Sequence, residues 1–348
     1  MTKSKGYGMK NKIMVAGNII VDYLYPITGY PERGQLTSIE DGCGKSVGGA
    51  VCNVGIDLKR LMPDTEICAL GLVGDDDSGR YALSVMEDEG VNTSLVGKKG
   101  ATSFTYVMSD KISRERTFFQ YRGANAHFSE ESFNWDDVDC DLLHIAYILL
   151  LDELDKEDSE YGTKMARLLA HAKERGIKTS IDVVSETGER FGRLVPPALR
   201  YTDYCIINEI EASRSTGIPL RAEDGALIYE NVKKVLSKLF ELGVSEWAVI
   251  HSPEGGFGMD KDGDYAECGL VYTPSGFIKG KVGAGDAFCA GVLSAAHRGL
   301  SLLDAVKLGN AAATVSLRSP GATEAMETIE ETMRICSELG FEPVKLSK

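Results

Sequence analysis

The chain has 348 residues, enough to bury the core of one large α/β domain. Its formal net charge of −14 at pH 7 argues against a nucleic-acid partner or an anionic membrane surface, because both need a basic footprint. The eight cysteines show no C-x-x-C pairing, and no apolar stretch resembles a signal peptide or a membrane span. We therefore expect a cytoplasmic protein with free thiols and a disordered extension over residues 1–10.

The first predicted strand covers residues 12–16 and is followed by Gly17 and then by Asp22. An acid just beyond the carboxyl end of a strand lies where α/β sheets bind their ligands. The alternative is a solvated loop aspartate.

A pair of glycines, Gly48 and Gly49, precedes a helix expected over residues 50–61. Two successive glycines let the backbone approach a ligand closely. Asn53 lies on the first turn of that helix, where its side chain can reach the same ligand.

Two β-prone blocks, at about 25–46 and 101–124, interrupt the pattern of the main sheet and predict a second, smaller sheet. Asn125 follows the second block directly. Its amide could bind a ligand hydroxyl, and a turn asparagine is the alternative.

The rest of the chain alternates apolar strands with amphipathic helices. This alternation predicts a mainly parallel sheet covered on both faces, a three-layer α/β/α fold. The expected strands cover residues 67–73, 142–150, 177–183, 204–207 and 247–251, and the expected helices include 164–174, 232–242 and 303–317.

Asn208 and Glu211 follow the expected strand 204–207 with the spacing N-x-x-E. Residues three apart share one face of a helical turn, so both side chains would lie at the ligand edge of the sheet. A capping box, with Asn208 as N-cap and Glu211 at the third position, explains the spacing equally well.

The most informative stretch is Gly283-Ala284-Gly285-Asp286, which opens a small-residue helix. Glycines before a helix let backbone amides converge on an anion, and a carboxylate beside them can accept a hydroxyl proton. This pair is what phosphoryl transfer to a hydroxyl needs. The alternative is a tight turn with Asp286 as a simple N-cap.

Taken together, these motifs resemble those of the ribokinase-like (pfkB-type) carbohydrate kinases. The resemblance rests mainly on Gly-Ala-Gly-Asp-Ala-Phe at 283–288, with Gly-Gly-x-x-x-Asn at 48–53 and N-x-x-E at 208–211 in support. It implies one kinase domain over 11–345, with a β-sheet lid formed by about 25–46 and 101–124 that closes over the sugar.

The resemblance also implies roles for individual residues. Asp286 would be the general base, and the amides of Gly283, Ala284 and Gly285 would form the anion hole. The acceptor would be bound by Asp22, Gly48, Gly49, Asn53 and Asn125. ATP would contact Asn208, Gly256 and Asn310, with Mg²⁺ held, through water, by Asn208 and Glu211.

The sequence departs from the family pattern at three places. Ala50 stands where ribokinases usually carry lysine, which puts ribose in doubt as the acceptor. Pro253 replaces the first glycine of the turn that ends at Gly256. Gly280 replaces an aspartate that helps to form the K⁺ site of cation-activated members, so K⁺ dependence is in doubt. We hypothesise that Lys281 supplies a fixed positive charge for ATP instead.

The expected function is ATP-dependent phosphorylation of a primary hydroxyl of a sugar by a homodimer that pairs through the lid. Three alternatives stay open. A nucleoside kinase fits the aromatic-rich lid. A phosphosugar kinase would need a basic pocket, for which Arg122 and the turn at 111–116 are candidates. A catalytically silent sugar- or nucleotide-binding regulator would not need Asp286 as a base.

Overall fold

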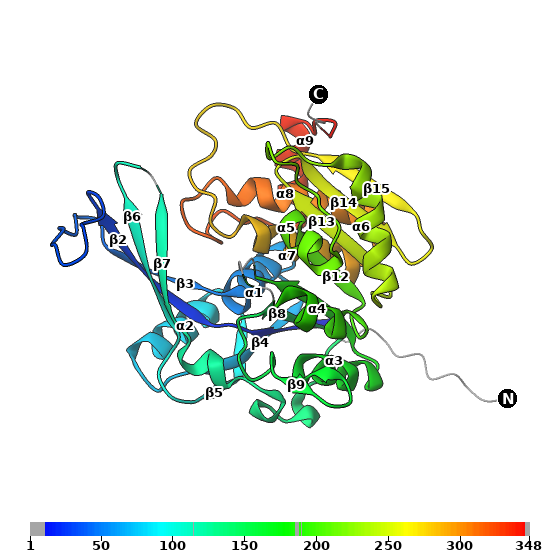
Figure 1. Cartoon of the computed structure of the whole chain (residues 1–348), viewed down its shortest axis with the longest axis horizontal. Helices are drawn as coiled ribbons and strands as arrows, with labels where there is room; N and C mark the ends of the chain where they lie inside the picture. The colour runs from blue at the N-terminus through cyan, green and yellow to red at the C-terminus, as the bar shows by residue number, and fades with distance from the viewer. Residues whose placement is uncertain (1–10, 114, 185–187, 189, 345–348) are drawn as a thin grey trace.

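The structure, a computed structural model, describes residues 11–344 except 114, 185–187 and 189. Two separate sheets dominate it (Figure 1). The larger sheet has nine strands in the order β15 (Tyr265–Gly269), β14 (Gly255–Asp260), β13 (Trp247–Ser252), β12 (Tyr204–Asn208), β11 (Lys178–Val183), β8 (Leu142–Ile148), β1 (Lys12–Gly17), β4 (Glu66–Val73) and β5 (Asn92–Lys98).

The order of the strands reverses between β1 and β8. On one side of β1 the chain adds β4 and then β5. On the other side it adds β8, β11, β12 and β13 in turn, and all these strands are parallel. Gly17, the last residue of β1, pairs with Gly71 of β4 and with Ala146 of β8, so these two strands continue past the end of β1 to Val73 and Ile148. Ligands of open α/β sheets bind at such a reversal, beyond the carboxyl ends of the strands.

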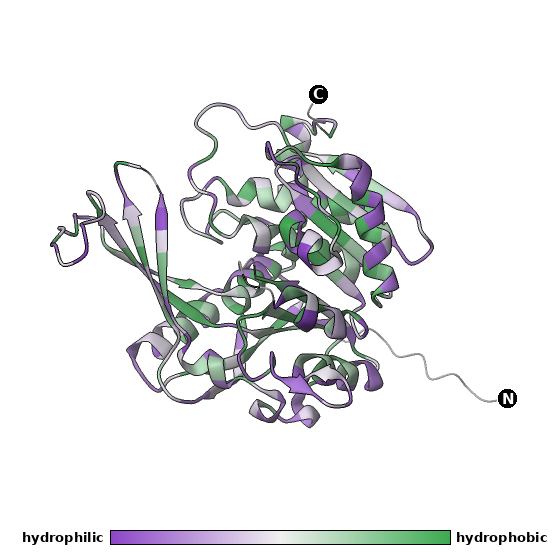
Figure 2. Cartoon of the chain, viewed as in Figure 1, coloured by the Kyte–Doolittle hydropathy of each residue, from purple (hydrophilic) through white to green (hydrophobic). Residues whose placement is uncertain are grey.

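Helices cover both faces of the larger sheet. Alternate residues of β1 enter different cores: Ile13 and Val15 pack on one face, and Met14 and Ala16 on the other. The first face carries α1 (Ala50–Leu61), α2 (Asp77–Asp88), α7 (Ala284–His297) and α8 (Leu302–Ser316), with α9 (Ile329–Leu339) on α8. The second carries α3 (Lys164–Glu174), α4 (Phe191–Leu199), α5 (Glu209–Thr216) and α6 (Tyr229–Glu241). Figure 2 shows the central strands as largely hydrophobic.

The smaller sheet projects from the body of the molecule (Figure 1). Its order is β3 (Gly44–Gly48), β2 (Ile20–Ile27), β6 (Phe104–Asp110) and β7 (Arg116–Tyr121), and only β2 and β6 are parallel. β7 is an edge strand that is exposed at every residue. Short elements complete the chain: η1 (Gly123–His127), η2 (Glu130–Ser132), η3 (Trp135–Asp137), β9 (Glu157–Asp158) and β10 (Gly162–Thr163).

The three-layer fold with a small second sheet is as predicted from the sequence. The first strand of the small sheet begins at Ile20, however, rather than near residue 25, because no glycine or proline interrupts the chain between them. The antiparallel hairpin of β14 and β15 was not predicted. The expected extension over 1–10 and the expected domain end at 345 lie outside the described residues. Within those residues, no helix has the length and apolarity that crossing a membrane requires.

Candidate active site

The side chain of Asp286 lies at the reversal point of the large sheet, in the first turn of α7. Tyr147, near the end of β8, donates its hydroxyl to Asp286 Oδ1 at 2.6 Å. Asn53, in the first turn of α1, donates Nδ2 to Asp286 Oδ2 at 2.8 Å. Each carboxylate oxygen therefore has its own donor, and the orientation of the group is fixed.

Burial sets the basicity of this carboxylate. Burial raises the pKa of Asp286 above that of an ordinary aspartate, and the hydrogen bonds from Tyr147 and Asn53 oppose the increase by stabilising the ionised form. In its ionised form, a carboxylate with a raised pKa is a better base for a hydroxyl proton than a solvated one.

The start of α7 presents amides beside Asp286 that have no backbone partner within the described part of the chain. The first bond within the helix runs from Ala287 N to Gly283 O at 2.8 Å, so the amides of residues 284–286 precede it. Gly283 has φ 75°, and a Cβ there would lie 2.7 Å from the Cβ of Ala322. Only glycine fits this turn, which aims the amides at one point where an anion can bind.

The imidazole of His251 lies against Gly285. A Cβ at Gly285 would lie 3.4 Å from the His251 ring, which also packs on Phe288 with 4.9 Å between ring centroids. Burial lowers the pKa of His251 to about 4. The ring is therefore neutral and adds no charge to the anion-binding turn.

Gly48 and Gly49 make room for two oxygens. A Cβ at Gly48 would lie 2.4 Å from Asp22 Oδ2, and one at Gly49, where φ is 81°, would lie 2.4 Å from the carbonyl of Asn18. The glycines thus let α1 begin directly against the β1–β2 junction and leave space for the Asp22 carboxylate, whose pKa is raised by burial.

Two buried polar atoms near this junction have no hydrogen-bond partner among the described residues. They are Oδ1 of Asn53, an acceptor, and Nδ2 of Asn18, a donor. Buried polar atoms are normally paired, so such atoms at a ligand edge indicate a polar ligand. Asn18 was not predicted as a site residue, because it belongs to no recognisable sequence motif.

The structure shows a backbone contact for Asn125, and its expected contact with the acceptor stays a prediction. Its Oδ1 accepts from Ile19 N at 3.2 Å and its Nδ2 donates to Ile19 O at 3.0 Å, and the residue is buried. These two hydrogen bonds fix the β1–β2 junction.

Asn208 and Glu211 form the capping box. Asn208 Oδ1 accepts from the amides of Ile210 and Glu211 at 3.0 and 2.9 Å, and Glu211 Oε2 accepts from Asn208 N at 3.0 Å. The capping box, which was the alternative explanation for the N-x-x-E spacing, is therefore present. It also fixes Glu211 at the carboxyl edge of the sheet, as a metal role would require.

Asp182, at the end of β11, is a candidate residue that sequence reasoning left unassigned. Burial and the nearby carboxylates of Glu211 and Asp286 raise the pKa of Asp182 well above the ordinary value. Three carboxylates that repel one another across a ligand edge favour a bound cation. No three acidic, histidine or cysteine residues in the described ranges close on one ion, so water and phosphate oxygens would complete the coordination, as Mg²⁺ prefers.

Two residues expected to bind ATP are held by packing. Gly256 lies in β14, and a Cβ there would be 2.8 Å from Val306 Cγ1. Asn310, in α8, donates Nδ2 to the carbonyls of Cys268 and Gly269 at 2.8 and 3.0 Å. Both residues hold β14 and β15 against α8. This packing alone is a sufficient reason for a glycine at 256 and an asparagine at 310, and their expected contact with ATP stays a prediction.

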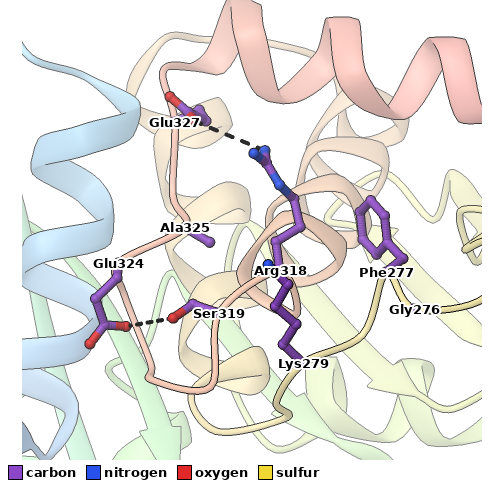
Figure 3. A pocket seen from close by; sticks show the side chains of 8 residues that line it. All are labelled: Gly276, Phe277, Lys279, Arg318, Ser319, Glu324, Ala325 and Glu327. Carbon is purple, nitrogen blue, oxygen red and sulfur yellow. Dashed lines mark hydrogen bonds and ion pairs between the residues drawn. The ribbon is translucent and has the colours of Figure 1, made fainter.

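The segment before the anion-binding turn borders a pocket of about 460 Å³ (Figure 3). Lys279 and Arg318 are the basic residues that line it, and Glu324 and Glu327 are the acidic ones. Glu324 accepts a hydrogen bond from Ser319 at 3.3 Å, and Glu327 lies 4.0 Å from Arg318. The chain continues through Gly280 to Lys281, whose side chain is exposed.

Gly280 itself has no room for a side chain. A Cβ there would lie 2.6 Å from the carbonyl oxygen of Ser319 and 2.7 Å from Pro320 Cα. The aspartate of cation-activated kinases could not be accommodated at this position, so the residues present do not fit that K⁺ site.

Known proteins resemble this chain over nearly its whole length. A family model described as pfkB family carbohydrate kinase matches residues 10–329. The 5-dehydro-2-deoxygluconokinase of Geobacillus thermodenitrificans is 24% identical over 296 residues, 82% of this chain and 83% of that protein. The ribokinase of Schizosaccharomyces pombe is 24% identical over 328 residues, covering 92% and 96%. The nucleoside kinase of Methanocaldococcus jannaschii is 24% identical over 331 residues, covering 94% and 97%.

Solved structures agree in fold. Ribokinase of Arabidopsis thaliana, complexed with ribose and ATP, superposes with a TM-score of 0.76 at 19% identity, covering 93% of this chain and 98% of that one. The Methanocaldococcus jannaschii nucleoside kinase superposes with a TM-score of 0.72 at 19% identity, covering 95% and 99%.

The fold and these relatives define an ATP-dependent phosphotransferase with an alcohol group as acceptor. Because the family model spans most of its length, the chain belongs to the pfkB family of carbohydrate kinases. The family, the fold and the enzyme class expected from the sequence are thereby confirmed. The three relatives differ in the acceptor that their names give.

Proposed function

We propose that the protein transfers the γ-phosphoryl group of ATP to a primary hydroxyl of a sugar or sugar-like acceptor, with Asp286 as the base. The single observation that carries this proposal is the arrangement at the start of α7, where an oriented, buried carboxylate adjoins the helix amides of residues 284–286, which have no backbone partner among the described residues.

The acceptor hydroxyl would be placed between Asp286 and the amides. Asp22, the free Oδ1 of Asn53 and Nδ2 of Asn18 would bind the other hydroxyls of the acceptor, since two of these three polar atoms are buried without partners among the described residues. Asp286 would take the hydroxyl proton as the oxygen attacks the phosphorus.

Charge on the transferring group would be held by the amides of residues 284–286, with the exposed Lys281 as a nearby positive charge. Mg²⁺, when bound with ATP, neutralises phosphate charge, and Asp182, Glu211 and Asn208 are the residues that would hold it through water. These residues position the nucleotide, which is the main catalytic demand of phosphoryl transfer.

Asp286→Asn tests the assignment of the base. The variant keeps the size of the side chain and can still accept a hydrogen bond, so ATP and acceptor should bind normally. We expect kcat to fall by at least ~10²-fold, the scale of general-base catalysis. Calorimetry would confirm that binding is retained, and near wild-type turnover would refute the role of Asp286.

One observation favours an acceptor that carries an anionic group. Nη1 of Arg122, at the end of β7, is buried without a hydrogen-bond partner among the described residues, and its Nη2 lies 3.9 Å from Asp152. An unpaired guanidinium nitrogen suits a carboxylate or phosphate. A sugar acid or a phosphosugar is therefore our second candidate, ahead of a nucleoside, and a relative that acts on a gluconate derivative supports it.

We further propose that activity does not require K⁺. Gly280 cannot carry the missing aspartate, and Lys281 stands in the next position. Turnover should be the same in a buffer whose only monovalent cation is tetramethylammonium and in the same buffer after K⁺ has been added. A strong K⁺ requirement would contradict this proposal. Lys281→Met should then lower turnover whether or not K⁺ is present.

A further inference from the structure

A largely buried arginine joins the start of α5, which the proposed ATP site uses, to the turn between β13 and β14. Arg221 lies between α5 and α6. Its Nε and Nη2 donate to Glu209 Oε1 at 3.1 and 2.7 Å, and its Nη1 and Nη2 donate to the two carboxylate oxygens of Glu254 at 2.5 and 2.8 Å. One guanidinium therefore bridges two carboxylates with four hydrogen bonds.

The two acids lie on different parts of the site. Glu209 is the first residue of α5, next to Asn208 and two residues before Glu211. Glu254 is in the turn between β13 and β14, where its Oε2 accepts from Ser252 Oγ at 2.8 Å and its amide donates to the same hydroxyl at 3.1 Å. Arg221 is thus the link between the helix that would hold the metal and the turn that follows β13. β13 pairs Asn208 with His251, whose ring lies against Gly285, so this turn is next to the amides that would hold the phosphate.

The link is shielded from solvent. The side chains of Arg221 and Glu254 are 17% exposed and that of Glu209 is 10% exposed. Removing one partner of a shielded ion pair leaves the other charge without compensation. Without Arg221, Glu209 and Glu254 would be two facing anions, and the turn would move away from α5.

We propose that Arg221 is a positioning residue for ATP: it holds the β13–β14 turn against the start of α5 so that both can contact the same nucleotide. This inference rests on the proposed function. The acceptor residues belong to α1 and the small sheet, which Arg221 does not touch in the described structure, so only the nucleotide side should depend on it.

The test compares Arg221→Met and Arg221→Lys with Arg334→Met. Arg334 is a matched control, because it also bridges two glutamates, Glu331 and Glu338, but on the exposed surface of α9. We expect Arg221→Met to raise the KM for MgATP at least about tenfold, with the acceptor KM and the kcat at saturating ATP within twofold of wild type. Arg221→Lys should raise the KM for MgATP less than Arg221→Met does. The control, Arg334→Met, should leave this KM unchanged.

A second variant separates positioning from a general loss of structure. Glu254→Gln in the Arg221→Met background removes the repulsion between the two acids and should restore part of the ATP affinity, measured by calorimetry with ADP. If Arg221→Met does not fold, Arg221→Lys should show the same rise in MgATP KM on a smaller scale.

The outcomes are distinct. An unchanged MgATP KM in a folded Arg221 variant, or an equal rise in the acceptor KM, would overturn the inference alone. A wild-type protein that binds no ATP would overturn the proposed function together with it.

Discussion

At the scale of single residues, Asp286 takes its orientation from two neighbours on different elements. Tyr147 and Asn53 each occupy one carboxylate oxygen, which leaves the group fixed before any ligand binds. A fixed base contributes to the rate because no reorganisation is needed when the hydroxyl arrives.

The hydrogen bond from Tyr147 predicts a shift in pH dependence. A donor to the ionised form lowers the pKa of a carboxyl, so Tyr147→Phe should raise the pKa of Asp286 further. Activity needs ionised Asp286 and falls as pH drops through that pKa. The acid limb of the kcat/KM profile should therefore move to higher pH in the variant.

Tyr161→Phe is the control, because Tyr161 lies beyond β9 and packs on Tyr201, away from Asp286. An acid limb at the same pH in Tyr147→Phe and wild type would contradict the role given to Tyr147.

Sequence patterns predicted some of these residues and not others. Asp286 and Asn53 were found because the glycines at 283 and 285 and at 48 and 49 mark the starts of helices, and the structure brings the two side chains within 2.8 Å. Tyr147 and Asp182 carry no such mark. Each lies at the end of an apolar strand, and only the folded sheet shows which strand ends meet. Asn125 and Asn310 matched a family pattern, yet backbone partners explain both.

At the scale of elements, α1 links the site to the core. It begins against the β1–β2 junction through Gly49 and positions Asn53 on its first turn. One turn later Asp57 is fully buried, and neither of its carboxylate oxygens has a hydrogen-bond partner among the described residues. Burial and the nearby Asp286 raise the pKa of Asp57 well above its ordinary value near 3.8.

Asp57 predicts a pH-dependent stability difference. With its folded pKa raised, the folded chain retains a proton that the unfolded chain releases above about pH 4, so wild-type stability falls as pH rises toward the folded pKa. Asp57→Leu lacks this loss. From pH 5 to pH 8, the free energy of unfolding of the variant should improve relative to wild type, by about 1.4 kcal/mol for each pH unit of this range that lies below the folded pKa of Asp57.

Urea unfolding at both pH values measures this difference. If the difference in free energy of unfolding between variant and wild type is the same at pH 5 and pH 8, the pKa of Asp57 is not raised as described. This holds however well the leucine packs. Because only the change in the gap is compared, a constant cost of fitting the new side chain cancels.

Most elements could be predicted because their apolar periodicity is strong, as in the helix expected over 50–61, which α1 matches. The β14–β15 hairpin was missed because its glycines break the strand pattern. These glycines are required by packing: Gly256 lies against Val306, and Gly258 against Leu302. The reason for their identity lies in α8, far along the sequence.

At the scale of the whole molecule, the projecting small sheet ends in an unpaired edge. Phe118, Phe119 and Tyr121 of β7 are 63%, 54% and 47% exposed. Apolar side chains on a free strand edge favour pairing with another chain. We propose that two copies associate through this sheet.

Light scattering across working concentrations measures the association. Wild type should be a dimer, and Phe118→Lys should shift it toward the monomer because a charge on the edge opposes pairing. Leu303→Lys, an exposed site on α8, is the control. A wild-type monomer at every concentration would refute the proposal.

The central claim is Asp286-dependent transfer of phosphate from ATP to an alcohol acceptor. The most direct measurement is ATP consumption over a panel of pentoses, ketohexoses, polyols, sugar acids, phosphosugars and nucleosides, with Asp286→Asn as the blank. We expect turnover with one acceptor class and none in the blank, and Nη1 of Arg122, which has no hydrogen-bond partner among the described residues, favours an anionic acceptor. Turnover that persists in the blank, or ATP bound without turnover for any member of the panel, would contradict it.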